Sequence, residues 1–218
     1  MKAIYFPDAP EQFGYLPSVP FILKEIYIDK WYERFLIARK DLTIFDVGAY
    51  TGITANYLSD FARVIHAVEP NKENYECLVE TVKYNKLDKV KTYKAAITAK
   101  DGPVKLFNGG QNSANNILGG AAGFEEVEGW SLDTLFKKTG ETHVDLLKID
   151  IEGAEFEVIG GKAFKDNAGK IDLIMGETHT WANRNPNQVY WALRDNGFEV
   201  ELPKSDAQVY VARRIIWR

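Results

Sequence analysis

The sequence is poor in cysteine and has no excess of positive charge. Cys77 is the only cysteine in 218 residues, so no disulfide can form within the chain and zinc sites built from several cysteines are excluded. The formal net charge is −4, which gives no long-range attraction to phosphate backbones or anionic lipid surfaces. We therefore expect a protein of the reducing cytoplasm that binds neither nucleic acid nor a membrane.

Long hydrophobic runs are also absent. Apolar stretches such as FILKEIYIDKW at 21–31 are broken by charged residues within a few positions, so we expect neither a signal peptide nor a membrane-spanning helix. Hydrophobic residues make up 45% of the chain and charged residues 27%, which is typical of a packed globular protein. The length fits one domain with decorations.

Short apolar runs alternate with helical patterns from residue 42 onward. This rhythm predicts an α/β fold, in which a mostly parallel sheet is joined by right-handed crossovers with helices on its faces. Between residues 71 and 84, the spacing of Tyr75, Leu78, Val79 and Val82 predicts a helix with one face on the sheet. The predicted strands are 42–47, 63–69, 90–97, 144–150, 170–177, 198–202 and 207–213.

The two ends of this pattern suggest the domain organisation. Residues 1–40 begin with a proline-rich arm and continue as a helical stripe to about Arg39, which we expect to pack on the core or to cap it. Residues 41–218 form the main domain, with a small β and loop insertion at about 98–130. Its segment 109–123 is rich in glycine and asparagine, and both a flexible linker and a substrate loop fit this composition.

The stretch DVGAYTG at 46–52 joins the first predicted strand to a helix. A glycine turn at this place lets backbone amides approach a ligand, and the helix dipole adds positive charge, so a nucleotide-like ligand is expected. The dinucleotide fingerprint G-x-G-x-x-G is not met. The stretch instead resembles the D/E-x-G-x-G-x-G turn of S-adenosylmethionine-dependent methyltransferases, with tyrosine in place of the middle glycine. The cofactor-binding candidates here are Asp46, Gly48, Ala49, Tyr50 and Gly52.

The second predicted strand ends in VIHAVEP. Glu69 lies at the position where a doubly wound fold offers a carboxylate to the ribose hydroxyls of its ligand, and Pro70 marks the edge of the sheet. Both residues are added to the cofactor-binding candidates.

Two further strands end in polar residues. In VDLLKIDIEGAE at 144–155, Lys148 and Asp150 point to the same face because side chains alternate along a strand. In LIMGETHT at 173–180, the same rule pairs Glu177 with His179. The carboxyl ends of neighbouring parallel strands share one edge, so we expect Asp150, Glu177 and His179 to converge there.

Other acids and histidines of the chain have structural explanations at this stage. Glu152 and Glu155 open a helix, where negative charge complements the helix dipole, so capping competes with function for both. His66 falls within a strand and His143 precedes one, so a structural role is expected for these two histidines.

Together these residues resemble the FkbM-type methyltransferases. The resemblance rests on DVGAYTG, VIHAVEPNKENYECLVETVKYN, LKIDIEGAE and IDLIMGETH, in the family's order, over about residues 42–180. It implies a Rossmann-like methyltransferase fold whose seven-stranded sheet is mostly parallel and has an antiparallel terminal strand. It also implies S-adenosylmethionine as cofactor and transfer of its methyl group to a hydroxyl of a sugar or other small metabolite. Matching by motif places the methionine end at Asp46, Gly48 and Gly52, the ribose at Glu69, the adenine near Ala95 or Ala96, and the methyl group beside Asp150.

The expected mechanism is alignment of an acceptor oxygen with the methyl group, helped by a base. His179 or Asp150 is the preferred base, with Glu177 orienting the acceptor and Lys148 keeping Asp150 ionised. A metal-dependent version is conceivable, because two carboxylates and an imidazole suit several divalent ions, but the metal-free version is favoured by the lack of a recognised ligand motif. Two other hypotheses stay open: a nicotinamide-dependent oxidoreductase or epimerase, and a binding module without catalysis.

Overall fold

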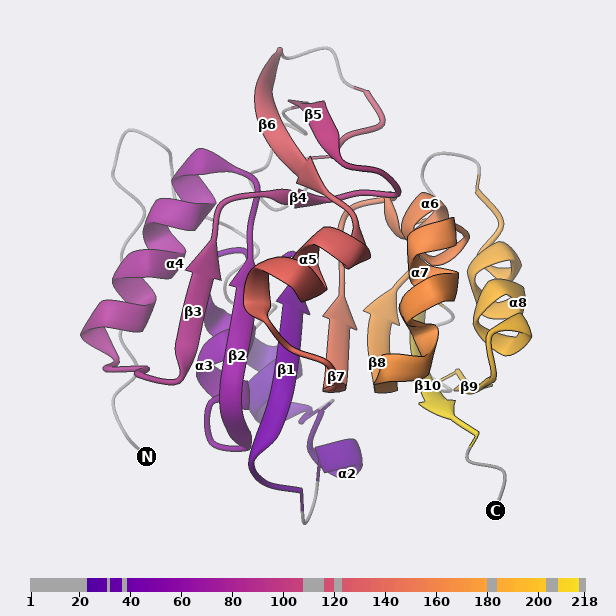
Figure 1. The fold of residues 1–218 in the computed structure, drawn as a ribbon. Helices are drawn as coiled ribbons and strands as arrows, with labels where there is room; N and C mark the ends of the chain where they lie inside the picture. Colours follow the sequence, from indigo (N-terminus) through magenta and orange to yellow (C-terminus); the bar gives the residue numbers. More distant parts are fainter. Residues whose placement is uncertain are drawn as a thin grey trace.

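The computed structural model describes residues 23–30, 32–36, 39–107, 116–119, 123–179, 184–202 and 208–215. Its centre is a seven-stranded sheet of order β3-β2-β1-β7-β8-β10-β9 (Figure 1). Strand β10 runs antiparallel to β8 and β9, while the other pairs are parallel. This confirms the mostly parallel sheet with an antiparallel last strand. The strands are β1 (Leu42–Val47), β2 (Ala62–Val68), β3 (Val90–Tyr93), β7 (Val144–Ile149), β8 (Ile171–Glu177), β9 (Phe198–Glu201) and β10 (Val209–Arg214).

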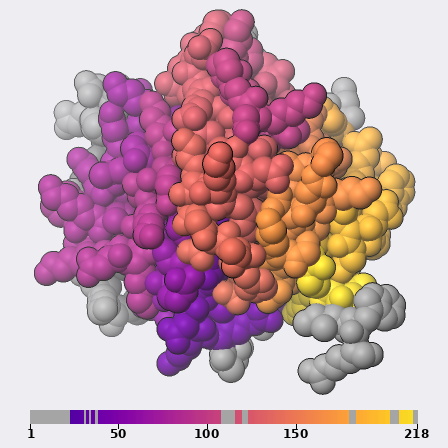
Figure 2. Space-filling view, in the orientation of Figure 1, coloured from indigo at the N-terminus to yellow at the C-terminus, as the bar shows by residue number. Residues whose placement is uncertain are grey.

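Helices cover both faces of the sheet, and two separate clusters of buried side chains lie between the layers. Because both faces are covered, the central strands have near-continuous apolar sequences: all six residues of β1 are buried. One face carries α5 (Leu132–Thr139), α6 (Glu155–Ile159), α7 (Lys162–Asn167), the 3₁₀ turn η4 (Ala168–Lys170) and α8 (Asn187–Asp195), and the other carries α2 (Glu33–Leu36), α3 (Ile53–Leu58) and α4 (Lys72–Tyr84). Figure 2 shows that the segments coloured salmon and orange make up much of the first of these faces.

The buried face of α4 differs in part from its predicted stripe. The helix has the predicted extent, and the Asn71 side chain caps it by accepting a hydrogen bond from the Asn74 amide at 3.0 Å. Its buried residues are Asn74, Leu78 and Thr81, whereas Val79 is 38% exposed. The prediction of Val79 as a core residue is therefore wrong, because the polar residues Asn74 and Thr81 take part in the buried face.

The order of the strands positions the functional edge. The chain leaves β1 toward β2 and β3 on one side, while β7 and β8 lie on the other side. The loops that follow β1 and β7 therefore diverge, and a crevice opens at their carboxyl ends, where doubly wound folds bind ligands. The two strand ends are tied together by the Asp150 amide, which donates a hydrogen bond to the Val47 carbonyl at 3.1 Å.

A second sheet stands over this edge (Figure 1). It has the order β4-β6-β5 and consists of β4 (Ala96–Ile97), β5 (Gly102–Phe107) and β6 (Phe124–Trp130). The single predicted strand 90–97 is therefore wrong: β3 ends at Tyr93, and β4 belongs to the second sheet. The hydrophobic pattern does not reveal this break because Ala95, which lies between the two strands, is itself fully buried. Most of the predicted loop 109–123 lies outside the described residues.

The region before β1 is described only from residue 23. The proline-rich arm lies outside this range. The single helical stripe expected to continue to Arg39 is instead divided into the π-helical turn η2 (Lys24–Ile28) and α2. Between them Lys30 has a left-handed backbone, with φ of 55°, which ends a right-handed helix. Phe35 and Leu36 of α2 are buried in the core under β1.

Within the described residues, no helix is both long enough and apolar enough to span a membrane.

Candidate active site

The two glycines of DVGAYTG are required by the packing of the chain on itself. Gly48 has φ of 78°, and a Cβ atom there would lie 1.8 Å from the carbonyl oxygen of Asp150. Gly52 has φ of 87°, and a Cβ atom would lie 2.8 Å from Cδ1 of Leu78 in α4. Gly48 therefore lets the β1 turn approach the end of β7, and Gly52 lets α3 approach α4.

The backbone amides of this turn are used within the protein. Those of Gly48 and Ala49 both donate to the Val68 carbonyl at 3.0 Å, and the Tyr50 amide donates to Oε2 of Glu69 at 2.9 Å. The expectation that these amides bind a ligand directly is therefore corrected, because they hold the turn against the end of β2. Tyr50 has φ of 51°, a value that glycine adopts most easily, so this tyrosine keeps the backbone shape of the glycine it replaces.

Glu69 is the buried acid to which this turn is attached. Its carboxylate accepts hydrogen bonds from the amides of Tyr50 and Asn71, at 2.9 and 3.0 Å, and from Nδ2 of Asn74 at 3.4 Å. Burial raises the pKa of Glu69 to about 7, and these hydrogen bonds oppose the rise. A carboxylate offers about four acceptor positions, and donors from the described residues occupy three of those of Glu69.

A cleft of about 270 Å³ extends from Glu69 to the end of β7. Pro70, Ala95 and Ala96 line it at the ends of β2 and β3, so small apolar residues face the space beside the Glu69 carboxylate. This combination of an acid and a narrow apolar slot fits the ribose and base of a nucleoside.

Lys148 joins the ends of β1 and β7. The Lys148 side chain is buried, and its Nζ lies 3.4 Å from Asp46, 3.7 Å from Asp150 and 2.5 Å from the Gly48 carbonyl oxygen. Burial alone lowers the pKa of Lys148, but the two carboxylates outweigh it and hold the pKa above its ordinary value. Lys148 is therefore charged. The Asp46 side chain is completely buried beneath the turn, and burial raises its pKa.

His179 lies two residues beyond β8 and points toward Asp150. Its backbone amide donates to Oε1 of Glu155 at 2.6 Å, and its Nδ1 lies 3.1 Å from the same oxygen. Its Nε2 lies 3.6 Å from Asp150 and 3.6 Å from Glu152. Burial lowers the pKa of His179, but the hydrogen bond to Glu155 and the nearby carboxylate charges raise it to about 9.

Glu152 and Glu155 belong to this group, although their positions in the sequence also suggested helix capping. The Glu155 side chain is completely buried, and its Oε2 accepts a hydrogen bond from the Gly153 amide at 2.8 Å. Glu152 has a left-handed backbone, with φ of 52°, and burial together with neighbouring carboxylates raises its pKa to about 7. Their spacing at the start of a helix gave no signal that separates a cap from a site residue.

Glu177 and Asp150 lie where the cleft meets a second, larger cavity. This cavity has a volume of about 670 Å³ and extends from the β1 turn to η2, α2 and β10. Both acids line both spaces, as do Gly48 and Tyr50. The predicted rim is therefore present: Asp150 and His179 are neighbours, and Glu177 shares both spaces with Asp150.

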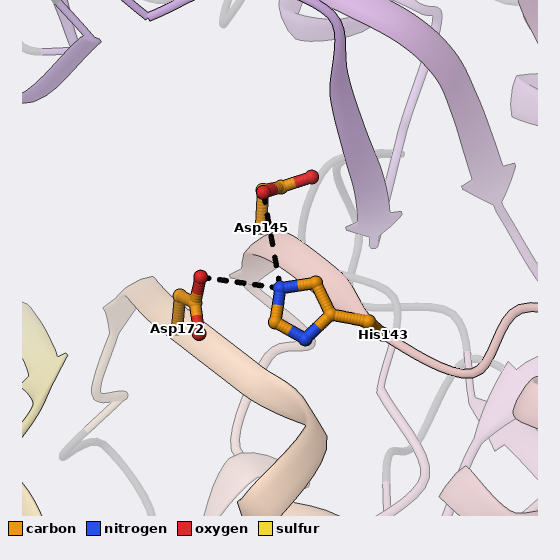
Figure 3. A group of neighbouring side chains, drawn as sticks. All are labelled: His143, Asp145 and Asp172. Carbon is orange, nitrogen blue, oxygen red and sulfur yellow. Dashed lines mark hydrogen bonds and ion pairs between the residues drawn. The ribbon is translucent and has the colours of Figure 1, made fainter. Parts of the chain in front are cut away.

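The other two histidines lie away from this edge. His66 is buried in β2 between the Tyr93 hydroxyl, 2.9 Å away, and Glu141, 3.1 Å away. His143 precedes β7, and its Nε2 lies 3.1 Å from Asp172 and 3.8 Å from Asp145 (Figure 3). Asp145 and Asp172 lie near the beginnings of β7 and β8, so this group is at the opposite edge of the sheet.

Comparisons with known proteins give the family. The family model described as the methyltransferase FkbM domain matches residues 46–200, most of the chain. The chain belongs to the FkbM methyltransferase family. This membership supports an S-adenosylmethionine-dependent methyltransferase and decides against the nicotinamide-dependent alternative. No curated protein matches the sequence significantly.

Solved structures share the fold of this methyltransferase at low sequence identity. A precorrin-6y C5,15-methyltransferase from Geobacter metallireducens GS-15 is 13% identical, with a TM-score of 0.58 over 99% of this chain and 100% of that chain. A SAM-dependent methyltransferase from Aquifex aeolicus is 13% identical, with a TM-score of 0.52 over 90% of this chain and 91% of that one. The N-terminal domain of EvdMO1, solved with SAH bound, is 14% identical, with a TM-score of 0.52 over 85% of this chain and 79% of that one.

Proposed function

We propose that this methyltransferase methylates a hydroxyl oxygen of a small acceptor, and that saccharides are the first class of acceptor to test. The observation that carries the proposal is the meeting of two spaces at Asp150 and Glu177. The narrow cleft beside Glu69 suits the cofactor, and the larger cavity suits an acceptor. The acids at their junction are positioned to bind the hydroxyl that receives the methyl group.

The cofactor would be held by residues at the ends of β1, β2 and β3. Glu69 would accept a hydrogen bond from a ribose hydroxyl, and Pro70, Ala95 and Ala96 border the space for the base. S-adenosylmethionine, when bound, supplies a methyl group on a positively charged sulfur. The carboxylates of Asp150, Glu152 and Glu177 make this end of the cleft negative, which favours a cation there.

The proton of the acceptor hydroxyl requires a base. With a pKa of about 9, His179 is protonated near neutral pH and cannot accept the proton. We therefore assign the role of base to Asp150 or Glu177 in place of His179. The charged Lys148 lies 3.7 Å from the Asp150 carboxylate and pairs with it. In this assignment His179 orients Asp150 and balances its charge.

The larger cavity combines apolar and acidic surfaces. Tyr32, Ile26 and Met175 supply apolar surface, while Glu25 and Glu177 supply carboxylates. A saccharide presents C–H faces and hydroxyl groups together, so it can use both kinds of wall. A hydroxylated metabolite with an apolar ring is the second acceptor class that this lining suits.

The test separates cofactor binding from methyl transfer. Calorimetry should detect binding of S-adenosylhomocysteine, and a radiolabelled methyl assay with a panel of saccharides and hydroxylated metabolites should detect transfer. Asp150→Asn should abolish turnover while it leaves cofactor affinity largely intact. Unchanged turnover in this variant would remove Asp150 from the mechanism. Binding without transfer to any acceptor in the panel would instead support the non-catalytic module.

A further inference from the structure

Three side chains that commonly bind metal ions converge at the junction of the two spaces. The candidate ligand atoms of Asp150, Glu152 and His179 all lie within 4.8 Å of one another. Nε2 of His179 is 3.6 Å from each of the two carboxylates, which is beyond hydrogen-bond length. Ligands bound to one ion at about 2.1 Å in tetrahedral geometry are separated by about 3.4 Å. The observed spacing is therefore close to that of a metal site.

The imidazole of His179 is held in the orientation that a metal ligand needs. Glu155 accepts hydrogen bonds from both the backbone amide and Nδ1 of this residue, so Nε2 is the nitrogen that faces Asp150 and Glu152. Glu155 is in turn fixed by the Gly153 amide and is completely buried. A buried carboxylate that orients a histidine in this way is the usual second shell of a metal-binding histidine.

The charge at this place also favours a cation. Glu155 and Glu177 add negative charge to that of Asp150 and Glu152. Lys148 is the nearby lysine, and it is shared between Asp150 and the buried Asp46.

The candidate ligand atoms of the His143 group at the opposite edge of the sheet also lie within 4.8 Å of one another, but this group differs in its hydrogen bonds and its exposure (Figure 3). Asp145 already accepts a hydrogen bond from the Thr43 amide at 2.7 Å, and the His143 side chain is half exposed. Its Nε2 lies 3.1 Å from Asp172, which is an ordinary hydrogen-bond distance. His143 and Asp172 therefore form an ion pair at the surface. A variant of His143 is a matched control for a variant of His179.

We propose that Asp150, Glu152 and His179 form a divalent cation site that holds the acceptor oxygen. The mixed nitrogen and oxygen donor set suits manganese or zinc better than magnesium, which prefers oxygen ligands. A bound ion lowers the pKa of a coordinated hydroxyl group, which is the property that an acceptor for methylation needs. This inference rests on the proposed function for the role of the ion, but the site itself can be tested without catalysis.

The experiment is a titration of the metal-stripped protein with Mn²⁺ in the absence of cofactor, followed by electron paramagnetic resonance. We expect one bound ion per chain, with affinity weakened roughly 10-fold or more in Glu152→Gln and His179→Gln. The control variant His143→Gln should bind as the unchanged protein does. Lack of binding at millimolar Mn²⁺ overturns the proposal, as does binding that is lost in the control variant and kept in Glu152→Gln.

A second measurement needs no substitution. In NMR spectra of the unchanged protein, substoichiometric Mn²⁺ should broaden the ring signals of His179 before those of His143; the reverse order overturns the proposal. Binding of S-adenosylhomocysteine, measured with a chelator present, distinguishes failure of the cation site from failure of the proposed function. If this compound binds while Mn²⁺ does not, the cation site fails and the proposed function stands. If Mn²⁺ binds at His179 and the compound does not bind, the proposed function fails and the cation site stands.

Discussion

Glu155 is bonded twice to His179, through the backbone amide and through the imidazole ring. One carboxylate oxygen, Oε1, lies 2.6 Å from the amide nitrogen and 3.1 Å from Nδ1. The contact connects the start of α6 to the loop after β8, and thereby fixes the imidazole beside Asp150. It also helps to raise the pKa of His179, together with the nearby charges of Asp150 and Glu152.

The first prediction concerns this protonation. Replacing Glu155 by Gln removes the charge while it keeps the size of the side chain, so the pKa of His179 should fall from about 9 toward the ordinary 6.5. An NMR titration of the histidine ring protons measures it, with His143 as the reference. An unchanged midpoint for His179 would show that Glu155 does not control this proton.

The second prediction is a loss of stability at alkaline pH. The folded-state pKa values of Glu152 and His179, about 7 and about 9, both lie above their ordinary values of 4.5 and 6.5. A group whose pKa is raised in the folded state stabilises the fold fully at pH values below its ordinary pKa. This stabilisation is lost as the pH rises through its folded-state pKa. The free energy of unfolding should therefore fall between pH 4.5 and 9. Urea unfolding across this range measures the slope, which should be shallower in the double variant Glu152→Gln, His179→Gln; an equal slope would contradict the assignment.

The third prediction separates the two reasons for glycine at the β1 turn. Gly48 and Gly140 have nearly the same φ, 78° and 75°, but a Cβ atom would collide with Asp150 only at position 48. Gly140→Ala should lower the free energy of unfolding by about 1–2 kcal/mol, the usual cost of placing alanine in the left-handed backbone conformation. Gly48→Ala adds steric overlap and should cost more than about 3 kcal/mol. Denaturant unfolding of both variants gives the difference, and equal losses would mean that the turn shifts to accommodate the methyl group.

The fourth prediction concerns the buried charge of Lys148. Replacement by Met leaves Asp46 buried without its cation, so the variant should lose about 3–5 kcal/mol of stability. Adding Asp46→Asn should restore part of this loss, because the isolated charge is then also removed. Lys162 pairs with Asp166 on the surface, and its replacement by Met should leave the unfolding midpoint unchanged. If the double variant Lys148→Met, Asp46→Asn is no more stable than Lys148→Met alone, the loss of stability does not come from the unpaired charge of Asp46.

Much of the fold follows from local patterns. The runs that become β1 and β7 are mostly apolar and are flanked by turn residues, and a strand buried on both faces needs this kind of composition. The break between β3 and β4 could not be predicted, because it depends on a second sheet whose strand β6 comes some thirty residues later in the chain. The buried face of α4 was misjudged at Val79 because an apolar stripe does not show that a polar residue such as Asn74 is buried, with Nδ2 donating to Glu69 just before the helix.

The candidate site was predictable where it lies at strand ends. Glu69, Asp150 and Glu177 lie at or next to the ends of their strands, as the pattern indicated. Glu155 was missed because acids are common in a first helical turn, and only the fold shows that this one is completely buried against His179. The use of the turn amides by Val68 and Glu69 was equally hidden, since it requires the register of β1 against β2.

The position of β10 has a consequence for how this protein is made. Strand β9 pairs in the main sheet only with β10, and the open edge of β8 is likewise completed by β10, although both strands precede it in the chain. During synthesis on the ribosome, the edge of β8 that pairs with β10 therefore stays unpaired until residues 209–214 have been made. Unpaired strand edges promote aggregation, so the nascent chain carries this hazard until β10 has paired.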